Sequence, residues 1–384
     1  MNSKEASSRR LRAGIIGGGR GAFIGSLHRI AAEIDGQASV VAGAMSADPA
    51  NARASAAAWF LDRSYDSYAE MARAEAARPD GIDFAIVATP NHMHWPVAKA
   101  FLEAGTHVIC DKPLAFSVEE AENFEKLARS GKPLFALTHN YTGYPAVRQA
   151  RAMVREGQIG TVRKVLVEYN QDWLMEPLER SGNKQAAWRT DPTRAGISSC
   201  VGDIGTHAEN LLEYVTGQQI ESLCADLTPF VEGRQLDDDA NVLLRLKGGG
   251  KGTLVCSQVA CGEENALAIR VYGSRGGLEW HQQEPNTLIH KPPGGQPWQL
   301  LRCGRSFGSA EAGAATRTPA GHPEGYLEAF AVIYKDFIAD VRRVAAGEAP
   351  LRNYPTARDG LRGMQFIARC VESSARGAAW VKMP

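Results

Sequence analysis

Short apolar runs that alternate with amphipathic stretches characterise the first 144 residues. Gly, Pro, Asp or Asn bound these runs, as is typical of buried parallel strands. The runs are Ala13–Ile16, Val40–Ala44, Phe84–Ala88, Val108–Cys110 and Leu134–Leu137. Between them, apolar residues recur at helical spacing, for example at Leu27, Ile30, Ala31 and Ile34. This alternation predicts an α/β domain built on a doubly wound parallel sheet.

The pattern changes after residue 144, where strand-like stretches follow one another without helices between them. These stretches are Val162–Tyr169, Ala240–Leu246, Thr253–Val259 and Ala268–Tyr272. Helices are predicted at Ala146–Glu156, Ala208–Val215 and Leu327–Val344. We therefore expect two domains, 1–144 and 145–384, the second an α+β domain with a large, mainly antiparallel sheet. The segment Gln282–Ala320, rich in Gly, Pro and Ser, is expected to be irregular, and a surface excursion is favoured over a lid or an oligomer arm.

Composition restricts the classes of partner. The chain has 384 residues, with 43 Lys plus Arg against 43 Asp plus Glu, so no net field attracts nucleic acid or an acidic membrane surface. No apolar stretch is long enough to cross a bilayer. No apolar secretory core follows Met1–Arg12, so we expect no signal peptide and a cytoplasmic location. A small, uncharged ligand is the favoured partner.

Metal binding and disulfide bonding are not expected. The seven cysteines are odd in number, scattered from Cys110 to Cys370, and form no CxxC pair, which favours reduced thiols. His92 and His94 could hold a metal, but no acidic or cysteine partner lies at ligand spacing.

A glycine-rich loop follows the first predicted strand and precedes a helix. Dinucleotide folds need glycine here, because the turn is tight and the backbone approaches the pyrophosphate at the helix N-terminus. Gly17 and Gly19 match the first two positions, and the third is either Ala22 or, if a short insertion precedes it, Gly25. The expected cofactor contacts in this loop are Gly17, Gly19, Ala22, Phe23 and Ile24.

The end of the second predicted strand leaves the choice between NAD and NADP open. An acidic residue normally binds the adenosine ribose at this point, but the chain reads Ala44-Met45-Ser46-Ala47-Asp48. Ser46 can hydrogen-bond either a ribose hydroxyl or a phosphate oxygen. We expect both cofactors to support turnover.

Two further motifs follow predicted strands, at the edge where open α/β sheets bind ligands. They are Thr89-Pro90-Asn91-His92-Met93-His94 and Asp111-Lys112-Pro113. The second half adds Trp188-Arg189-x-Asp191-Pro192 and Gly202-Asp203-Ile204-Gly205-Thr206-His207. Over nearly the whole chain, this combination resembles the glucose-fructose oxidoreductase/inositol dehydrogenase (Gfo/Idh/MocA) family. The family mostly carries Glu where this chain has Asp111, and a glycine-rich run where it has Gly196–Cys200.

The resemblance implies an NAD(P)-dependent oxidoreductase with a Rossmann domain and a second domain for substrate binding and oligomerisation. It implies that Lys112 orients the nicotinamide and the reacting hydroxyl, that His207 accepts the proton, and that Asp203 positions the substrate or tunes that pair. Independent chemistry supports these roles, because hydride leaves a carbinol carbon only if the hydroxyl proton is also removed. Asp203 and His207 would share a helical face, which Asn210 and Tyr214 extend.

The remaining site predictions concern the loops and the substrate pocket. Further cofactor contacts are expected at Thr89, Pro90, Asn91, His94, Asp111 and Lys112. Substrate contacts are expected at Tyr144, Trp188, Arg189, Asp203, His207 and His322. An indole face suits the C–H face of a sugar or cyclitol ring.

The predicted reaction is oxidation of a secondary ring hydroxyl of a sugar, glycoside or inositol-type polyol to a ketone. A sugar–sugar oxidoreductase that retains and recycles its cofactor is one alternative. A non-catalytic dinucleotide-sensing protein of the same fold is another. The presence of Lys112, Asp203 and His207 together favours an enzyme. A sheet covered on only one face also predicts a homodimer or homotetramer joined through the other face.

Overall fold

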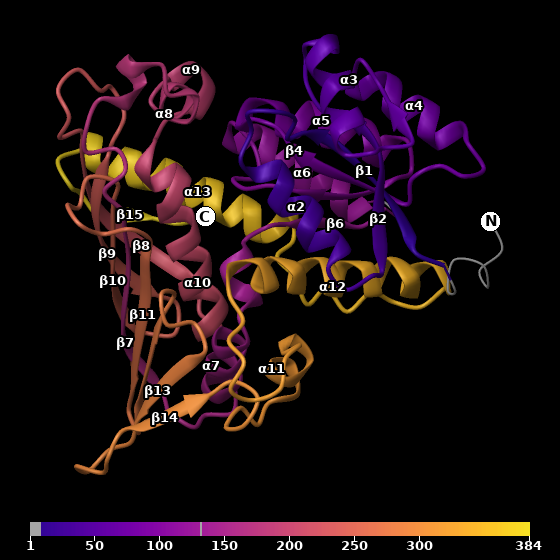
Figure 1. The fold of residues 1–384 in the computed structure, drawn as a ribbon. Helices are drawn as coiled ribbons and strands as arrows, with labels where there is room; N and C mark the ends of the chain where they lie inside the picture. Colours follow the sequence, from indigo (N-terminus) through magenta and orange to yellow (C-terminus); the bar gives the residue numbers. More distant parts are fainter. Residues whose placement is uncertain (1–8, 131–132) are drawn as a thin grey trace. The chain divides into compact units, whose positions relative to one another are not determined.

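The computed structural model describes residues 9–130 and 133–384, which form two compact units (Figure 1). The first unit contains the chain up to Asn140 together with Phe330–Leu361. The second contains Tyr141–Ala329 and Arg362–Pro384. From its sequence, segment 330–361 was placed in the second domain, whereas in the structure it belongs to the first unit. Residues 1–8, on which part of the signal-peptide prediction depends, lie outside the described residues.

The first unit is built on a six-stranded sheet with the order β3-β2-β1-β4-β5-β6. Its strands are β1 (Leu11–Gly17), β2 (Ala38–Ala44), β3 (Arg63–Ser64), β4 (Phe84–Ala88), β5 (His107–Cys110) and β6 (Phe135–Leu137). All neighbouring strands pair in parallel. The order reverses between β1 and β4, which creates the ligand crevice of a doubly wound fold and confirms the predicted class. β3 was not predicted, because two residues carry no periodicity.

Helices connect these strands: α2 (Ile24–Glu33), α3 (Pro49–Ala58), α4 (Tyr68–Ala77), α5 (His94–Glu103) and α6 (Val118–Ser130). The first unit also holds most of α12 (Tyr326–Ala345) and the start of α13 (Ala357–Ala375).

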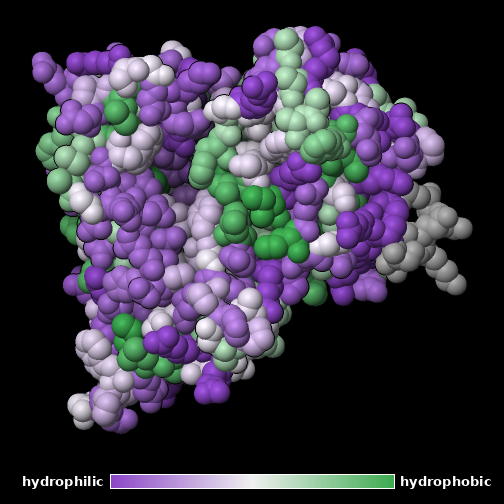
Figure 2. Space-filling model, in the orientation of Figure 1, coloured by the Kyte–Doolittle hydropathy of each residue, from purple (hydrophilic) through white to green (hydrophobic). Residues whose placement is uncertain are grey.

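The helix α2 was predicted correctly, but of its four predicted apolar positions only Ala31 is buried. Its buried residues are Gly25, His28, Ala31 and Ala32. Ile30 and Ile34 are 42% and 43% exposed, and Figure 2 shows a hydrophobic patch over this helix. The first turn of α2 lies so close to the glycine loop that only glycine fits at position 25, where the helix faces the loop.

The second unit is built on a nine-stranded sheet with the order β14-β13-β12-β11-β7-β10-β9-β8-β15. Its strands are β7 (Val162–Asn170), β8 (Ile220–Thr228), β9 (Asp239–Leu246), β10 (Lys251–Ser257), β11 (Ala266–Gly273), β12 (Gly277–His281), β13 (Thr287–Lys291), β14 (Gln299–Arg302) and β15 (Val381–Lys382). β7 and β10 pair in parallel, and the other neighbouring strands are antiparallel. The predicted mainly antiparallel sheet is confirmed.

One face of this sheet is covered by α7 (Pro145–Arg155), α10 (Thr206–Thr216) and the end of α13 (Figure 1). Along β9, Ala240, Val242 and Leu244 are buried, whereas Asn241 and Leu243 are exposed. The strand therefore has one covered and one open face, as its alternating sequence predicts. The unit also contains the short helices α8 (Lys184–Arg189), α9 (Pro192–Ala195) and α11 (Ala310–Ala315).

The prediction of an irregular segment at 282–320 was wrong. The segment contains β13, β14 and α11, and β13 and β14 pair antiparallel through a turn that includes Gly294 and Gly295. Strands of four and five residues show too little alternation to be recognised beside such a glycine-rich turn. Among the described residues, no helix is long and apolar enough to span a membrane.

Candidate active site

The glycine loop joins β1 to α2 through backbone conformations that favour glycine. Gly17 and Gly18 have φ values of +78° and +69°. A Cβ atom at Gly17 would lie 2.6 Å from the carbonyl oxygen of Ala88, and one at Gly19 would lie 2.7 Å from that of Met45. The N–H of Gly19 donates to the same Met45 oxygen at 3.1 Å. The loop therefore packs tightly against the ends of β2 and β4.

Gly25 occupies the third position of the motif, which the sequence left open between Ala22 and Gly25. A Cβ atom at Gly25 would lie only 2.3 Å from the carbonyl oxygen of Gly18. Ala22 lies in the loop before α2, where its N–H donates to the Gly19 oxygen at 2.9 Å. The close approach between helix and turn thus depends on Gly25.

The start of α2 fits a dinucleotide pyrophosphate. No side chain caps this helix, in contrast to α3 and α4, which are capped by Asp48 and Ser67. Phe23 before the first turn is 68% exposed. The backbone N–H groups of this turn therefore face no competing side-chain acceptor, and the helix dipole favours an anion there.

Ser46 lies directly after β2 and has local partners. Its Oγ accepts from the N–H of Asp48 at 3.1 Å and from Asn51 Nδ2 at 3.4 Å. The carboxylate of Asp48 accepts from the N–H groups of Ala50 and Asn51, so it acts as the N-cap of α3. Asp48, the carboxylate nearest to Ser46 along the chain, therefore already accepts hydrogen bonds from the main chain of α3.

His94 connects the loops that follow β4 and β5. Its Nδ1 lies 2.7 Å from the Pro113 oxygen and its Nε2 lies 2.9 Å from the Thr89 oxygen. Burial lowers the pKa of His94, and the nearby charge of Asp111 opposes this. Because both ring nitrogens face main-chain oxygens, His94 supports the loops from inside. Thr89 Oγ1 is buried with no partner among the described residues, as expected of a group that awaits a ligand.

Asp111 and Lys112 leave the end of β5 together. Asp111 Oδ1 accepts from the N–H of Lys112 and from Thr138 Oγ1, each at 2.9 Å. Burial, together with the ammonium of Lys112, lowers the pKa of His139 to about 3. The Lys112 charge therefore acts on His139, which follows β6 at the carboxyl edge of the sheet.

In the second unit, Asp203 lies in a π-helical turn, Val201–Gly205, that leads into α10. Its Oδ2 accepts from Arg189 Nε at 3.0 Å and from Gln258 Nε2 at 2.9 Å. His207 follows in the first turn of α10 and is 6% exposed. Such π turns are frequent at functional sites. Tyr214, to which the predicted face extends, packs its ring 4.4 Å from the Arg151 guanidinium of α7.

Two buried tyrosines surround His207. The Tyr141 ring meets the imidazole edge-on with centroids 4.8 Å apart, and the Tyr169 ring lies 6.3 Å away. The two hydroxyls are hydrogen-bonded to each other, and Tyr169 also donates to Asn265 Oδ1 at 2.8 Å. This network restrains the rings that hold the imidazole.

The sequence missed Tyr169, Gln258 and Asn265, and strand register explains why they meet. Asn170 at the end of β7 pairs with Ser257 at the end of parallel β10 and with Ala266 at the start of antiparallel β11. The residues next to these positions therefore gather at one end of the sheet. From the alternation of residues in β7, the sequence could have shown only that Tyr169 lies on the covered face of the sheet.

Trp188 and Arg189 lie on α8 and are brought to Asp203. The Arg189 guanidinium stacks 4.2 Å from the Trp188 ring and 5.6 Å from the Trp173 ring. Its Nη1 donates to Gln185 Oε1 at 2.8 Å. Arg189 thus combines an ion pair with cation–π contacts, which hold its side chain in one direction.

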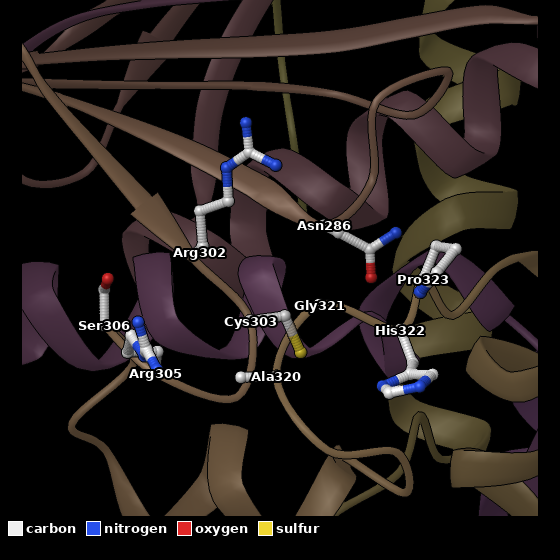
Figure 3. Close-up of a pocket in the computed structure, with 9 residues that line it drawn as sticks. All are labelled: Asn286, Arg302, Cys303, Arg305, Ser306, Ala320, Gly321, His322 and Pro323. Carbon is white, nitrogen blue, oxygen red and sulfur yellow. The ribbon is translucent and has the colours of Figure 1, made fainter.

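Tyr144 and His322 lie away from this cluster of polar groups. Tyr144 is fully buried between the rings of Tyr141 and Trp280, and its hydroxyl accepts from Gln282. His322 is exposed on the loop before α12, where its Nδ1 lies 3.2 Å from the Pro319 oxygen. It lines a separate cavity of about 600 Å³ (Figure 3). The other residues of this cavity are Asn286, Arg302, Cys303, Arg305, Ser306, Ala320, Gly321 and Pro323.

Comparison with known proteins identifies the family. A model described as the oxidoreductase family NAD-binding Rossmann fold matches residues 11–139. A model of the GFO/IDH/MocA C-terminal domain matches residues 147–279. The chain belongs to the Gfo/Idh/MocA family. It is therefore an NAD-binding oxidoreductase, as the sequence motifs predicted. Among the described residues, no three or more His, Cys, Asp or Glu side chains are grouped to hold a metal ion.

Relatives of this Gfo/Idh/MocA protein align over nearly its full length. The uncharacterised oxidoreductase YfiI of Bacillus subtilis is 34% identical, and the alignment covers 100% of this chain and 99% of the relative. The structure of an inositol dehydrogenase homologue from Azotobacter vinelandii with NAD+ is 37% identical, with a TM-score of 0.94 and all of both chains covered. Levoglucosan dehydrogenase with NADH and levoglucosan is 26% identical, with a TM-score of 0.84 and coverage of 98% and 100%.

Proposed function

We propose that this oxidoreductase is an NAD(P)-dependent dehydrogenase that oxidises a secondary ring hydroxyl of a sugar, glycoside or inositol-type polyol to a ketone. The observation that carries the proposal is the cluster around Asp203 and His207 in the second unit. A histidine braced by two tyrosines stands in the first turn of α10, directly after a carboxylate fixed by Arg189 and Gln258. Such an arrangement suits removal of a proton from a bound hydroxyl.

The chain's residues then divide the work of the reaction. His207 accepts the hydroxyl proton while the C–H electron pair leaves as hydride, and a bound nicotinamide supplies the hydride acceptor. Lys112 donates a hydrogen bond to the developing alkoxide and orients the substrate against the nicotinamide. Asp203, fixed by its two donors, positions the substrate and His207. Tyr144 acts through Tyr141, against which it stacks.

The proposed cofactor cradle is the carboxyl edge of the first unit. Gly17, Gly19 and the first turn of α2 would bind the pyrophosphate, and Ser46 would bind the adenosine ribose. Thr89 offers a buried hydroxyl oxygen with no partner among the described residues. Because no free carboxylate follows β2, we propose that NAD and NADP both support turnover.

The substrate class is supported by the aromatic side chains near Asp203 and by the relatives. The rings of Trp173 and Trp188 lie beside Arg189, the ion-pair partner of Asp203. Aromatic faces suit the apolar C–H faces of sugar and cyclitol rings. The names of two relatives, inositol dehydrogenase homologue and levoglucosan dehydrogenase, agree with this class.

A substrate screen tests the proposal. Inositols, aldoses and glycosides are offered with NAD and with NADP, and the absorbance band of the reduced nicotinamide is followed. We expect turnover with at least one ring polyol, loss of it in His207→Ala, and normal rates in the control His290→Ala on β13. Reduced cofactor already bound to the purified protein, with reduction of a second sugar, would instead identify a sugar–sugar oxidoreductase. Cofactor binding without any turnover would identify a sensor.

We also propose that the protein is a homodimer or homotetramer joined through the open face of the nine-stranded sheet. Exposed apolar side chains on these strands and the segments beside them include Leu243, Trp298, Leu300 and Trp380. Sedimentation at micromolar concentration should show an oligomer, and Leu243→Arg should weaken it. A monomer under these conditions would contradict this proposal.

A further inference from the structure

A chain of buried groups lies beneath the Asp111–Lys112 turn in the first unit. His28 on α2 is fully buried, and its Nδ1 lies 2.7 Å from the hydroxyl of Tyr334 on α12. On the other side of the ring, Nε2 lies 3.9 Å from Asp111 Oδ1. This nitrogen has no hydrogen-bond partner among the described residues. The imidazole also meets the ring of Phe330 edge-on at 5.0 Å, so it is held in place from several sides.

The position of the proton on His28 follows from its neighbours. Burial raises the pKa of Tyr334 well above its usual value, so this phenol keeps its proton, which it donates to Nδ1 when the imidazole proton is on Nε2. Burial lowers the pKa of His28 to about 4, although the charge of Asp111 opposes this and His94 adds to it. The ring is therefore neutral at neutral pH. Of its two tautomers, the one protonated on Nε2 directs an N–H toward Asp111 and leaves Nδ1 to accept from Tyr334, whereas the other would turn a lone pair toward the carboxylate.

Asp111 Oδ1 is the point on which several donors converge. It accepts from the N–H of Lys112 and from Thr138 Oγ1, and His28 Nε2 approaches the same oxygen. This carboxylate determines how the chain leaves β5 and hence where Lys112 starts. Its direction is therefore sensitive to the charge contact with His28, which is too long for a hydrogen bond.

We propose that His28 is a positioning residue that couples α2, the helix of the glycine loop, to the Asp111–Lys112 turn. His28 lies one turn after Gly25, so the same helix carries the proposed pyrophosphate contact at its start and the His28 contact on its buried face. A dinucleotide held at α2 and Lys112 at the end of β5 are then linked through one rigid side chain. The role for Lys112 rests on the function proposed above, whereas the contact between His28 and Asp111 does not.

Nitrogen NMR of the ligand-free protein, labelled at histidine, tests the contact without any activity. We expect His28 to be neutral from pH 6 to 8 and to carry its proton on Nε2. Its signal is assigned by its loss in His28→Gln. In Tyr334→Phe, which removes only the hydroxyl beside Nδ1, the Nδ1 signal should move. A proton on Nδ1 in the unmodified protein would overturn the proposal.

Substitutions test the coupling. His28→Leu keeps the bulk but removes the donor, and NADH should bind about 10-fold more weakly, as measured by fluorescence of the bound nucleotide. His28→Gln, which keeps an N–H near the Nε2 position, should bind NADH within about twofold of the unmodified protein. In an Asp111→Asn background, His28→Leu should add much less than it does alone, because the charge that Nε2 faces is gone.

The control is His107→Leu, which removes a half-buried histidine at the opposite end of β5. His107 Nδ1 accepts from the N–H of Leu134 at 2.8 Å, so its loss is structural. We expect a lower melting temperature with near-normal NADH binding. Equal losses of NADH affinity in His28→Leu and His28→Gln would show that His28 contributes only through packing, and would overturn the proposal. If His28→Leu does not fold, Tyr334→Phe replaces it, with an expected loss of about threefold in NADH affinity and an unchanged affinity as the contradicting result.

These results separate failure of this proposal from failure of the proposed function. An unmodified protein that binds NADH but oxidises no ring polyol would contradict the dehydrogenase reaction and leave the His28 contact supported or refuted by NMR. Full activity with an Nδ1–H tautomer at His28 would refute the positioning role alone.

Discussion

The two units build their candidate sites from different materials. In the first unit, main-chain groups at strand ends do most of the work: glycines without side chains, the uncapped start of α2 and carbonyl oxygens held by His94. In the second unit, the site consists of side chains such as Asp203, His207 and Tyr169 that come from separate elements. A site built from main-chain groups accepts few ligand shapes, but many residues on its surface can be replaced. A site built from side chains loses function when any one of them is replaced. Apart from those at Lys112, substitutions in the first unit should therefore affect dinucleotide binding, and substitutions in the second unit should affect the chemical step.

The largest expected effect is on turnover through the second unit. His207→Ala should lower kcat by on the order of 10² to 10⁴, the usual contribution of a positioned base, while dinucleotide binding survives. The pH profile should lose its near-neutral limb. Steady-state kinetics beside a thermal melt measure this, and near-normal turnover in the folded variant would refute the proposed base.

A methyl group added at Gly25 in the first unit should instead weaken dinucleotide binding strongly. Gly25→Ala forces a Cβ atom to within 2.3 Å of the Gly18 oxygen, so α2 must move away from the loop. We expect NADH affinity to fall about 100-fold, equivalent to roughly 3 kcal/mol. Gly313→Ala is the matched control, since no atom lies within 4 Å of a Cβ atom there. Unchanged titration of NADH by the Gly25 variant would show that the helix does not bind the pyrophosphate.

Asp203→Asn should have an intermediate effect and tests how tightly the second site is coupled. The amide removes the charge that Arg189 pairs with, but keeps an oxygen that can still accept from Gln258. We expect kcat to fall by about 10- to 30-fold, which is the lower part of the roughly 1.5–3 kcal/mol that a hydrogen bond to a charged group contributes. Gln258→Ala should give a smaller loss in the same direction. A full loss of activity, as large as that in His207→Ala, would give Asp203 a direct part in proton transfer.

Ser46→Asp should change cofactor preference more than rate. A carboxylate at this position repels a 2′-phosphate and binds ribose hydroxyls, so the ratio of kcat/KM for NAD over NADP should rise about 10-fold. The unmodified protein should use both cofactors. A preference of several thousand-fold in the unmodified protein would show that Ser46 does not lie at the ribose.

The smallest effect expected at neutral pH is a change in folding stability that comes from His28 and His107 of the first unit. Burial lowers the pKa of His28 and of His107 to about 4, below their ordinary value of 6.5. As the pH falls below about 6.5, the unfolded chain takes up these protons and the folded unit does not, so stability falls until about pH 4. Each group costs up to about 1.4 kcal/mol per pH unit in this window. Urea unfolding at pH 7 and pH 5 should show the loss, and His107→Leu should reduce it.

Much of the first unit could be predicted because its signals are local. The strand Phe84–Ala88 was predicted with its observed bounds, since five consecutive buried residues end at a proline-containing turn. Ser117 accepts from the N–H of Glu120, and Glu120 accepts from the N–H of Phe116, so a capping box starts α6. The buried face of α2 was predicted only in part, at Ala31, because spacing alone does not show that Gly25 must touch the loop.

The sequence by itself determined the two fold classes, the glycine loop, the family, the strand-end motif with Lys112 and the motif with Asp203 and His207, because neighbouring residues carry each of these signals. Tertiary structure alone decided three other features. It selected Gly25 over Ala22, brought Gln258 to Asp203 through the register of β7 with β10, and set His28 against Asp111. These contacts join residues that are far apart in the chain or depend on sub-ångström packing. Strand register and helix approach decide them, and no local pattern records either.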